Sequence, residues 1–352
     1  MNFERTLIIK PSSMGDIVQA LPVLTALKES HPEARVSWLV FHSFAGILEG
    51  HPRIDDLIVF NRDRARRPWN PLAWIEVLRL RKVLRRARFT AVLDLQGLFR
   101  SAQFALWTGA ADRVGFAEAR ELAWRFYTDR VSASPHLHAV DRYLILARHV
   151  GLADPKARDH LPVAGQMREA VRRRLAQLGL GARDPFFVLS PHARWETKVW
   201  PPERFAEVCD RLYAATGARG VLVGGGKASA ELARSILAAA SAKPIDLVNR
   251  TSLKELVAVI AESRALVTND SGPLHVAAVV GTPVVAIFGP TDPGRTGPYG
   301  PGHRVLTGQA PCRPCFRRRC LYAGGPQALC CMKNVSAEDV AARLKEAWVA
   351  GR

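Results

Sequence analysis

Two stretches decide the fold: Leu7-Ile8-Ile9-Lys10-Pro11-Ser12-Ser13-Met14-Gly15-Asp16 near the start, and Phe186-Phe187-Val188-Leu189-Ser190-Pro191-His192 halfway along. Each begins with a run of apolar residues, which is typical of a short strand buried on both faces. A polar loop follows each run, and a helical pattern follows each loop. Because a buried strand joined to a helix is the repeating unit of a parallel α/β sheet, each stretch predicts the first strand of such a sheet.

Strand and helix patterns alternate outward from both stretches. In the first half we expect strands at 7–9, 36–40, 57–60 and 91–95, and helices at 16–30 and 72–88. In the second half we expect strands at 186–189, 220–223, 245–248, 265–267 and 284–288, and helices at 166–178, 202–216 and 228–241. This alternation predicts two parallel sheets whose ligands lie beyond the carboxyl ends of the strands. The predicted domains are 1–165 and 166–335, and a last helix in 336–352 can pack on either of them.

Length and composition narrow the class of protein. The 352 residues suit two domains of about 150 residues each. With 48% apolar and 23% charged residues, the chain can form sizeable cores and is not of a disordered type. The sequence shows no signal-peptide pattern and no run of about 20 apolar residues, so we expect a cytoplasmic protein. A net charge of +18 favours polyanionic partners such as nucleic acid, anionic lipid or phosphorylated sugar.

The loop after the first predicted strand is one candidate site. Its small residues allow backbone N–H groups to approach a ligand at the positive end of the following helix. Asp16 lies at the start of that helix, where a carboxylate is favoured. Two interpretations are open: Asp16 is a general base that faces the ligand, or it caps the helix and Ser12-Ser13 form a plain turn.

Three loops of the second half form another candidate site. In the loop after 186–189, Lys198 and Thr197 are placed to meet a diphosphate, although the loop can equally be a solvated one. After 265–267, Asp270 or Ser271 caps a helix whose first-turn N–H groups and His275 suit the same ligand. The Gly- and Pro-rich loop after 284–288 carries Thr291 and either wraps a ligand or forms a rigid turn.

Five segments in this order and spacing resemble the ADP-heptose lipopolysaccharide heptosyltransferases. They are Lys10-Pro11-Ser12-Ser13-Met14-Gly15-Asp16, Asp94-Leu95-Gln96-Gly97, Lys198-Val199-Trp200-Pro201, and the stretches 268–275 and 288–300. The serine-rich loop looks most like that of heptosyltransferase I. The resemblance implies a GT-B fold, in which two Rossmann-like domains face each other across a cleft, with the acceptor in the first domain and the donor in the second.

The resemblance also implies an activity and roles for single residues. It implies an inverting transfer of heptose from ADP-heptose to Kdo-lipid A, the inner core of lipopolysaccharide, with no obligatory metal. Asp16 takes the catalytic role. The implied donor-binding residues are Lys198, Thr197, Ser271, Gly272, His275 and Thr291, and the implied acceptor-binding residues are Ser12, Ser13, Gly15 and Gln96.

A cysteine-rich segment near the end departs from the heptosyltransferase I pattern. It looks more like that of some second-heptose enzymes, so a heptosylated acceptor stays open beside Kdo-lipid A. In a cytosolic chain, clustered cysteines indicate a metal or reduced thiols before disulfides. The spacing predicts either a structural zinc site or a loop of free thiols. The candidate ligands are Cys312, Cys315, Cys320 and either Cys330 or Cys331, of which Cys331 is the one assigned as the fourth ligand.

Much of the positive charge lies in one segment. Residues 62–88 contain ten basic residues but only two acidic ones, Asp63 and Glu76. The basic residues are Arg62, Arg64, Arg66, Arg67, Arg79, Arg81, Lys82, Arg85, Arg86 and Arg88. The default interpretation is a surface helix at 72–88 that packs through Leu72, Ile75, Leu78, Val83 and Leu84. The alternative is a peripheral attachment to an anionic membrane, at the inner face of the inner membrane.

A second class of function is a basic protein that binds polyanions without catalysis. No aromatic RNA-binding motif or helix-turn-helix pattern supports binding to nucleic acid. Aromatic residues are only 8% of the chain, and the positive charge is local. We therefore expect no nucleic-acid partner.

Overall fold

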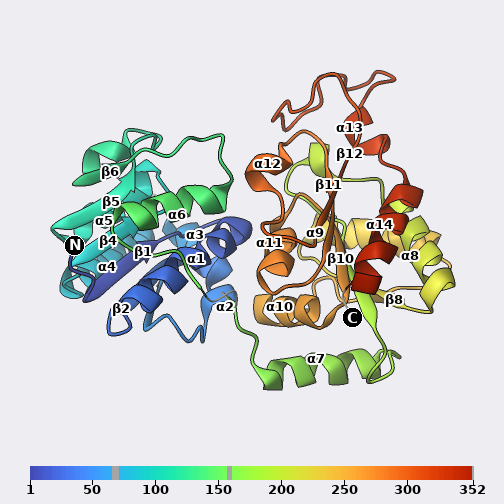
Figure 1. The fold of residues 1–352 in the computed structure, drawn as a ribbon, viewed down its shortest axis with the longest axis horizontal. Helices are drawn as coiled ribbons and strands as arrows, with labels where there is room; N and C mark the ends of the chain where they lie inside the picture. Colours follow the sequence, from blue (N-terminus) through green and yellow to red (C-terminus); the bar gives the residue numbers. More distant parts are fainter. Residues whose placement is uncertain (66–70, 157–160, 351–352) are drawn as a thin grey trace. The chain divides into compact units, whose positions relative to one another are not determined.

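The computed structural model describes residues 1–65, 71–156 and 161–350 (Figure 1). These residues form two compact units, Met1–Leu161 and Pro162–Arg352. No helix among them is long and apolar enough to cross a membrane. Each unit is a parallel α/β structure, so the predicted fold class is confirmed at this level.

The first unit is built on one six-stranded parallel sheet with the order β3-β2-β1-β4-β5-β6. Its strands are β1 (Arg5–Ile9), β2 (Arg35–Phe41), β3 (Asp56–Phe60), β4 (Ala91–Asp94), β5 (Asp112–Phe116) and β6 (Asp129–Val131). Its main helices are α1 (Met14–Ser30), α4 (Pro71–Arg86), α5 (Phe99–Thr108) and α6 (Ala139–His149), with shorter turns α2 (Ala45–Leu48) and α3 (Arg62–Ala65). All six strands are parallel, but the order in which the chain adds them to the sheet reverses between β1 and β4. Ligands of such folds bind where the strand order reverses.

The second unit repeats the arrangement with the sheet order β12-β11-β10-β7-β8-β9. Its strands are β7 (Phe186–Ser190), β8 (Arg219–Leu222), β9 (Ile245–Asp246), β10 (Ala265–Asn269), β11 (Val284–Phe288) and β12 (Arg304–Thr307). Its helices include α7 (Gly165–Gln177), α8 (Pro202–Thr216), α9 (Lys227–Ala239), α10 (Leu253–Glu262), α11 (Gly272–Val279), α12 (Pro293–Thr296), α13 (Cys330–Lys333) and α14 (Ala337–Ala350). Here the reversal lies between β7 and β10, which pair in parallel.

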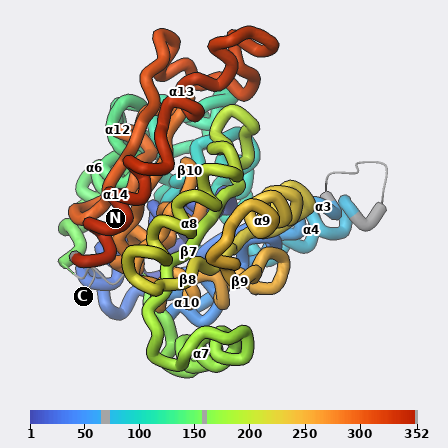
Figure 2. The backbone as a smooth tube through the Cα atoms, turned by 90° about the vertical axis from the view of Figure 1, so that its right-hand side faces the viewer, coloured from blue at the N-terminus to red at the C-terminus, as the bar shows by residue number. Residues whose placement is uncertain are grey.

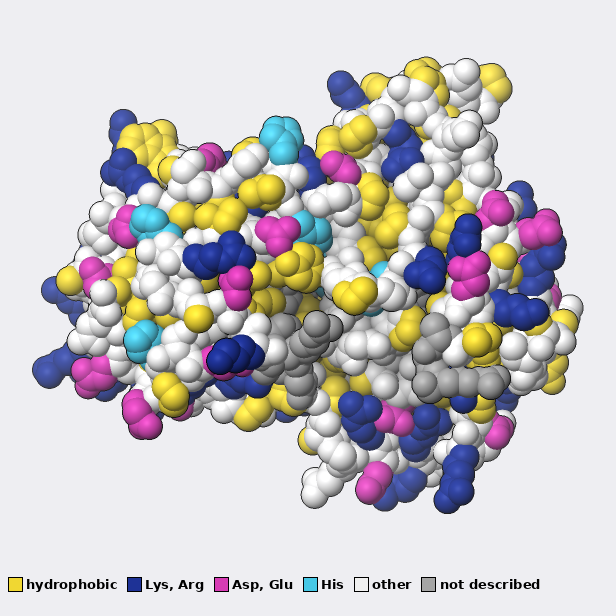
Figure 3. Space-filling model, in the orientation of Figure 1, with side chains coloured by type: hydrophobic (Ala, Val, Ile, Leu, Met, Phe, Trp, Pro, Cys, Tyr) yellow, Lys and Arg dark blue, Asp and Glu magenta, His cyan; other side chains and the backbone are white. Residues whose placement is uncertain are grey.

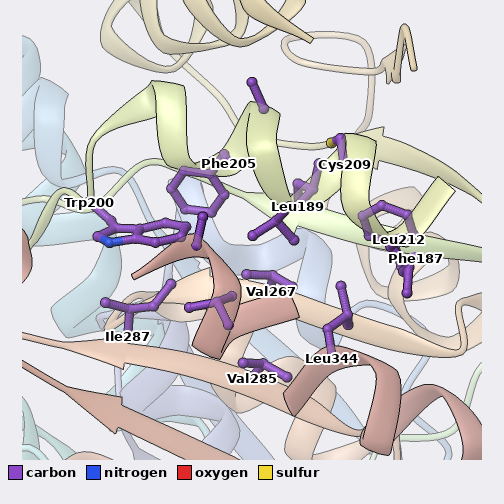
Figure 4. Close-up of a cluster of buried hydrophobic side chains, with 14 of the residues drawn as sticks. Phe187, Leu189, Trp200, Phe205, Cys209, Leu212, Val267, Val285, Ile287 and Leu344 are labelled. Atoms are coloured by element: carbon purple, nitrogen blue, oxygen red, sulfur yellow. The ribbon is translucent and has the colours of Figure 1, made fainter. Parts of the chain in front are cut away.

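The core of the second unit lies between the sheet and helices α8, α9 and α14. Figure 4 shows Phe205 of α8 and Leu344 of α14 in one buried cluster with the strand residues Val267 and Val285. In the tube of Figure 2, α8 and α9 run side by side, in agreement with their many contacts. The last helix therefore belongs to the second unit, which settles where residues 337–350 pack.

Trp200 anchors this core beside the candidate donor loop. Its side chain is fully buried, its ring meets Phe205 edge-on at 5.0 Å, and its Nε1 donates to the Val335 carbonyl at 3.1 Å. We expect Trp200→Ala to lower the free energy of unfolding by about 3–5 kcal/mol, because the substitution leaves a large cavity. Urea denaturation measures this loss. The exposed Tyr213→Ala on α8 is the control, and an equal loss there would contradict the assignment.

The charges of α7 are largely neutralised within the second unit. Arg168 and Arg172 both pair with Glu262, at 2.8 and 2.7 Å, and Arg174 pairs with Glu255 at 3.2 Å. In Figure 3 the Lys and Arg side chains over α7 lie beside Asp and Glu side chains. These arginines therefore hold α7 on α10 and do not form an open basic surface.

The apolar face of α4 differs from the expectation. Its buried residues are Ala73, Leu80 and Leu84, whereas Ile75 and Leu78 are exposed. Residues 73, 77, 80 and 84 are spaced by four, three and four positions, so they form one stripe along a helix, and the sheet covers that stripe. The predicted packing through Ile75 and Leu78 is wrong, and Val83 is also exposed at 40%. Arg66 and Arg67 lie outside the described residues, and the side chain of Leu72 is likewise not described.

Candidate functional site

Three neighbouring strands of the second unit place Lys198, Asp270 and Thr291 together. Lys198 follows β7, Asp270 follows β10, and Thr291 follows β11. The Asp270 Oδ2 atom accepts from Lys198 Nζ at 2.5 Å and from Thr291 Oγ1 at 2.7 Å. Because parallel strands end at the same edge of a sheet, three loops far apart in sequence converge at the point where the strand order reverses.

Asp270 is the centre of this cluster, a position that the sequence did not indicate. The sequence offered it as a helix cap, but Ser271 is the N-cap residue of α11. The carboxylate of Asp270 is nearly buried, and it holds both the ammonium of Lys198 and the hydroxyl of Thr291 in place. Lys198 also lies over the ring of Trp195, with its Nζ 4.4 Å from the ring centroid. The lysine is therefore fixed on two sides.

The N-terminus of α11 lies directly after Asp270. Gly272 is the first residue of the helix, Pro273 follows it, and His275 is nearly buried in the first turn. The first N–H groups of a helix have no partner within the helix and carry a partial positive charge. Lys198 and this helix end therefore combine a fixed cation with backbone donors, a pairing that suits a diphosphate.

Thr197 is placed differently from Lys198. It is nearly buried, and its Oγ1 donates to the Arg317 carbonyl at 2.8 Å. Arg317 belongs to the cysteine-rich segment, and two further contacts hold this segment in place. The Phe316 N–H donates to the Pro290 carbonyl at 2.8 Å, and Arg313 Nε donates to the Gly289 carbonyl at 2.6 Å. The cysteine-rich segment therefore packs against the loops after β7 and β11, which nothing in the sequence indicated.

The cysteines of this segment do not form the predicted zinc site. Within the described residues, no group of three or more His, Cys, Asp or Glu side chains is placed to hold a metal ion. Cys331 belongs to the hydrophobic core, and burial followed by its neighbouring cysteines raises its pKa to about 11. Cys320 Sγ instead accepts from the Leu329 N–H at 3.4 Å. The zinc prediction is therefore not supported, because these described cysteines are not grouped as metal ligands and Cys331, the assigned fourth ligand, faces the core.

In the first unit, Asp16 lies in the first turn of α1. Its Oδ2 atom accepts from the N–H of Ser13 at 2.9 Å and from Ser13 Oγ at 2.5 Å. These contacts are those of a capping box, so the capping interpretation holds as a matter of geometry. Asp16, Ser12 and Ser13 are all half-buried at the carboxyl end of β1, the edge of the sheet at which ligands of such folds bind.

A buried lysine lies next to Asp16. Burial by itself would lower the pKa of Lys10, but Tyr143, Asp16 and Asp94 more than offset this, and the pKa is raised. Lys10 Nζ donates to the Leu95 carbonyl at 3.0 Å. Lys10 therefore stays protonated and links the loop after β1 to the loop after β4. Its positive charge stabilises the negative charge of the Asp16 carboxylate.

Asp94 shapes the loop that carries Gln96. Its Oδ1 accepts from the N–H groups of Gln96 and Gly97 at 2.9 and 3.2 Å, and its Oδ2 accepts from Tyr127 Oη at 2.7 Å. Burial raises the pKa of Asp94 despite these hydrogen bonds. Gly97 adopts φ +66°, a conformation that glycine reaches without strain. The side chain of Gln96 is thereby held at the carboxyl end of β4.

A cavity of about 290 Å³ opens at this edge of the first sheet. Ser12 and Gln96 line it, and so do Arg62 and Arg100, neither of which the sequence analysis assigned to a ligand site. Among the described residues, the buried Gln96 Oε1 has no hydrogen-bond partner. A buried acceptor atom without a partner is costly, so this atom suits a hydroxyl of a bound ligand. Arg62 was noted only as part of the basic segment, and the sequence signal for Arg100 was only its position after a strand pattern.

Comparisons with known proteins agree with this geometry. The model of the family described as "Glycosyltransferase family 9 (heptosyltransferase)" matches residues 77–324. Lipopolysaccharide heptosyltransferase 1 of Pseudomonas aeruginosa is 33% identical over 323 residues, which cover 90% of this chain and 88% of that protein.

Solved structures of similar proteins cover nearly the whole chain. The Escherichia coli heptosyltransferase WaaC with ADP superposes with a TM-score of 0.77 at 26% identity, covering 97% of this chain and 99% of that one. A family 9 glycosyl transferase from Veillonella parvula reaches a TM-score of 0.84 at 23% identity, covering 99% and 98%, and supports the fold. The GT-B fold class is thus confirmed, and a binding protein without catalysis is not supported. The chain belongs to glycosyltransferase family 9, the heptosyltransferases.

Proposed function

We propose that this heptosyltransferase transfers heptose from ADP-heptose to Kdo-lipid A with inversion at the anomeric carbon. The observation that carries the donor assignment is the cluster of Lys198, Asp270 and Thr291 at the N-terminus of α11. The similar E. coli structure was solved with ADP, which fits a diphosphate at such a cluster. Similarity to heptosyltransferase 1 of P. aeruginosa supports the first-heptose reaction.

In the proposed reaction, Asp16 removes the proton of an acceptor hydroxyl. The oxygen attacks the anomeric carbon from the face opposite ADP, and the bond from that carbon to the β-phosphate oxygen breaks. Lys198, Thr291 and the backbone N–H groups near Ser271 and Gly272 stabilise the charge that develops on the leaving diphosphate. The reaction makes one C–O bond, breaks one, and leaves the proton on Asp16.

The remaining donor residues have supporting roles in this proposal. His275, in the first turn of α11, lies on the helix whose N-terminus meets the diphosphate. Thr197 acts through its bond to the Arg317 carbonyl and keeps the neighbouring Lys198 loop in place. Neither role needs a bound metal ion.

The acceptor is proposed to occupy the cavity lined by Ser12 and Gln96. Ser13 and Gly15 complete the loop that carries Asp16. Arg62 and Arg100 give the cavity a positive lining beside Glu121, which suits the carboxylate of an acidic sugar. The enzyme would then work at the cytoplasmic face of the inner membrane, where such a lipid-borne acceptor is accessible.

Transfer assays test the acceptor. We expect product from ADP-heptose and Kdo-lipid A. Product only with a heptosylated acceptor would instead assign a second-heptose transfer, which the cysteine-rich segment favours. Binding of ADP-heptose without transfer to either acceptor would contradict the acceptor proposal and keep the donor.

Gln96→Leu tests whether the Gln96 amide binds the acceptor, because it removes the amide with little change in side-chain volume. We expect the KM for the acceptor to rise about tenfold, because one hydrogen bond to a buried oxygen is lost. The KM for ADP-heptose should not change. Gln177→Leu, on the exposed end of α7, is the matched control. An unchanged acceptor KM would remove Gln96 from the acceptor site.

A further inference from the structure

Helix α4 presents large apolar side chains to solvent. Trp74, Ile75 and Leu78 are 59%, 58% and 59% exposed. They lie at spacings of one, three and four, so they share one side of the helix. Single exposed apolar residues are common, but three on two adjacent turns form a patch of the kind that marks an interaction surface.

Packing within the first unit does not account for this patch. Leu80 and Leu84 are 4% and 0% exposed, and with Ala73 they already fill the side that faces the sheet. The helix therefore has two apolar sides, and within the described part of the chain the sheet covers only one of them. A helix that needs only its own sheet has a single apolar stripe.

The second half of the same exposed side is basic. Arg81, Lys82, Arg85 and Arg86 are all exposed, and none of them forms an ion pair with another described residue. This contrasts with α7, where Arg168, Arg172 and Arg174 pair with Glu262 or Glu255. The exposed side of α4 thus combines two apolar turns with two basic turns.

The apolar turns lie toward the edge of the sheet that carries the cavity. β3 ends at Phe60 at the carboxyl edge, and α3 and then α4 follow it, so the first turns of α4 are nearest to that edge. α4 contacts both α3 and α5, and these two elements supply Arg62 and Arg100 to the cavity. The basic turns point to the opposite edge, where Arg79 lines a second cavity with Arg5 and Arg35.

We propose that the exposed side of α4 docks on an anionic phospholipid bilayer. Trp74, Ile75 and Leu78 enter the boundary between headgroups and acyl chains, and Arg81, Lys82, Arg85 and Arg86 meet the lipid phosphates. Apolar and basic residues on one helix face match the two layers of a bilayer surface. A polynucleotide would leave the apolar turns without a contact, and a second copy of the chain would bring like charges together.

This inference deepens the proposed function, because the surface would bring the neighbouring cavity to a lipid-borne acceptor. The docking does not depend on catalysis, however, and can be measured without transfer. Binding of the full chain to vesicles of phosphatidylethanolamine and phosphatidylglycerol, followed by sedimentation, is the direct measurement.

Two double variants separate the apolar and the basic contributions. We expect Ile75→Ser/Leu78→Ser to weaken vesicle binding about tenfold. We expect Lys82→Gln/Arg85→Gln to weaken it roughly thirtyfold at about 0.1 M salt, and the difference to shrink at about 1 M salt. The matched controls are Leu178→Ser/Val349→Ser and Arg211→Gln/Arg234→Gln, exposed residues of the second unit. Each control should change binding by less than about twofold.

Quenching of Trp74 fluorescence tests whether this side chain enters the bilayer, independently of how tightly the protein binds. Bromine on the upper acyl carbons of a lipid quenches a tryptophan that enters the bilayer boundary. We expect part of the wild-type fluorescence to be quenched on binding to brominated vesicles. Trp74→Phe should bind as well as wild type and lose that part, because phenylalanine keeps the face apolar.

Several outcomes would overturn the docking surface. Wild-type levels of binding by Ile75→Ser/Leu78→Ser, or unchanged quenching in Trp74→Phe, would do so. So would wild-type binding to RNA but not to vesicles, or concentration-dependent dimerisation that the apolar variant abolishes. Transfer to a water-soluble Kdo acceptor separates the two proposals: loss of transfer with intact vesicle binding contradicts the proposed function and supports the docking surface.

Discussion

Asp16→Asn is expected to lower kcat for heptosyl transfer by about 10³-fold, within the range by which a general base accelerates such a step. Asparagine can still accept the hydrogen bond from the Ser13 N–H, so the start of α1 should keep its cap. The free energy of unfolding should therefore fall by less than about 1 kcal/mol. Initial rates with both substrates saturating, and urea denaturation of the same sample, measure the two effects.

Binding of ADP-heptose provides the internal control for Asp16→Asn, because the donor residues lie in the other unit. Its dissociation constant should match that of wild type. A variant that keeps more than about a tenth of the wild-type kcat would show that Asp16 only caps the helix. A variant that unfolds more easily by several kcal/mol would show that the capping interaction, and not a proton transfer, was lost.

Lys198→Gln is expected to lower kcat/KM by about 10²- to 10³-fold, because it removes a fixed cation from the developing charge of the leaving diphosphate. The substitution also leaves the carboxylate of Asp270 without its cation, and this anion would repel the diphosphate. The affinity for ADP should therefore fall as well. Steady-state kinetics and calorimetric titration with ADP measure the two effects.

Lys243→Gln is the control for Lys198→Gln, since Lys243 lies in the same unit before β9 and far along the chain from the donor loops. It should leave kcat/KM and ADP affinity unchanged. Unchanged ADP affinity in Lys198→Gln would move the diphosphate away from the cluster. Recovery of ADP affinity in the double variant Lys198→Gln/Asp270→Asn would identify the carboxylate left without its cation as the cause of the loss.

The patterns that identified each sheet were the long apolar runs. Every strand expected at such a run is present, since a buried parallel strand must be apolar on both faces. The strands that the patterns missed are β5, β6 and β12, which begin with a charged residue and lie at or next to an edge of their sheet. An edge strand is covered on fewer sides, so its sequence carries a weaker signal.

The candidate site followed from the sequence only as far as each separate loop. The residues after β1, β7, β10 and β11 were identified because ligand-binding loops follow strands in α/β folds. The role of Asp270 was not, because its partners Lys198 and Thr291 are 72 and 21 positions away. The sequence likewise did not show that Arg62 and Arg100 line one cavity with Gln96, because these residues lie in separate loops and helices.

The sequence by itself determined the α/β class, the two series of strands and helices, and the loops that carry Asp16, Lys198 and His275. Local periodicity and backbone chemistry specify those features, since each depends on residues a few positions apart. Only the tertiary structure decided that Asp270 fixes Lys198, that Cys331 faces the core, and that Ile75 and Leu78 of α4 are exposed. Each of these depends on which distant segment covers a side chain, and that is decided when the sheets and helices pack together.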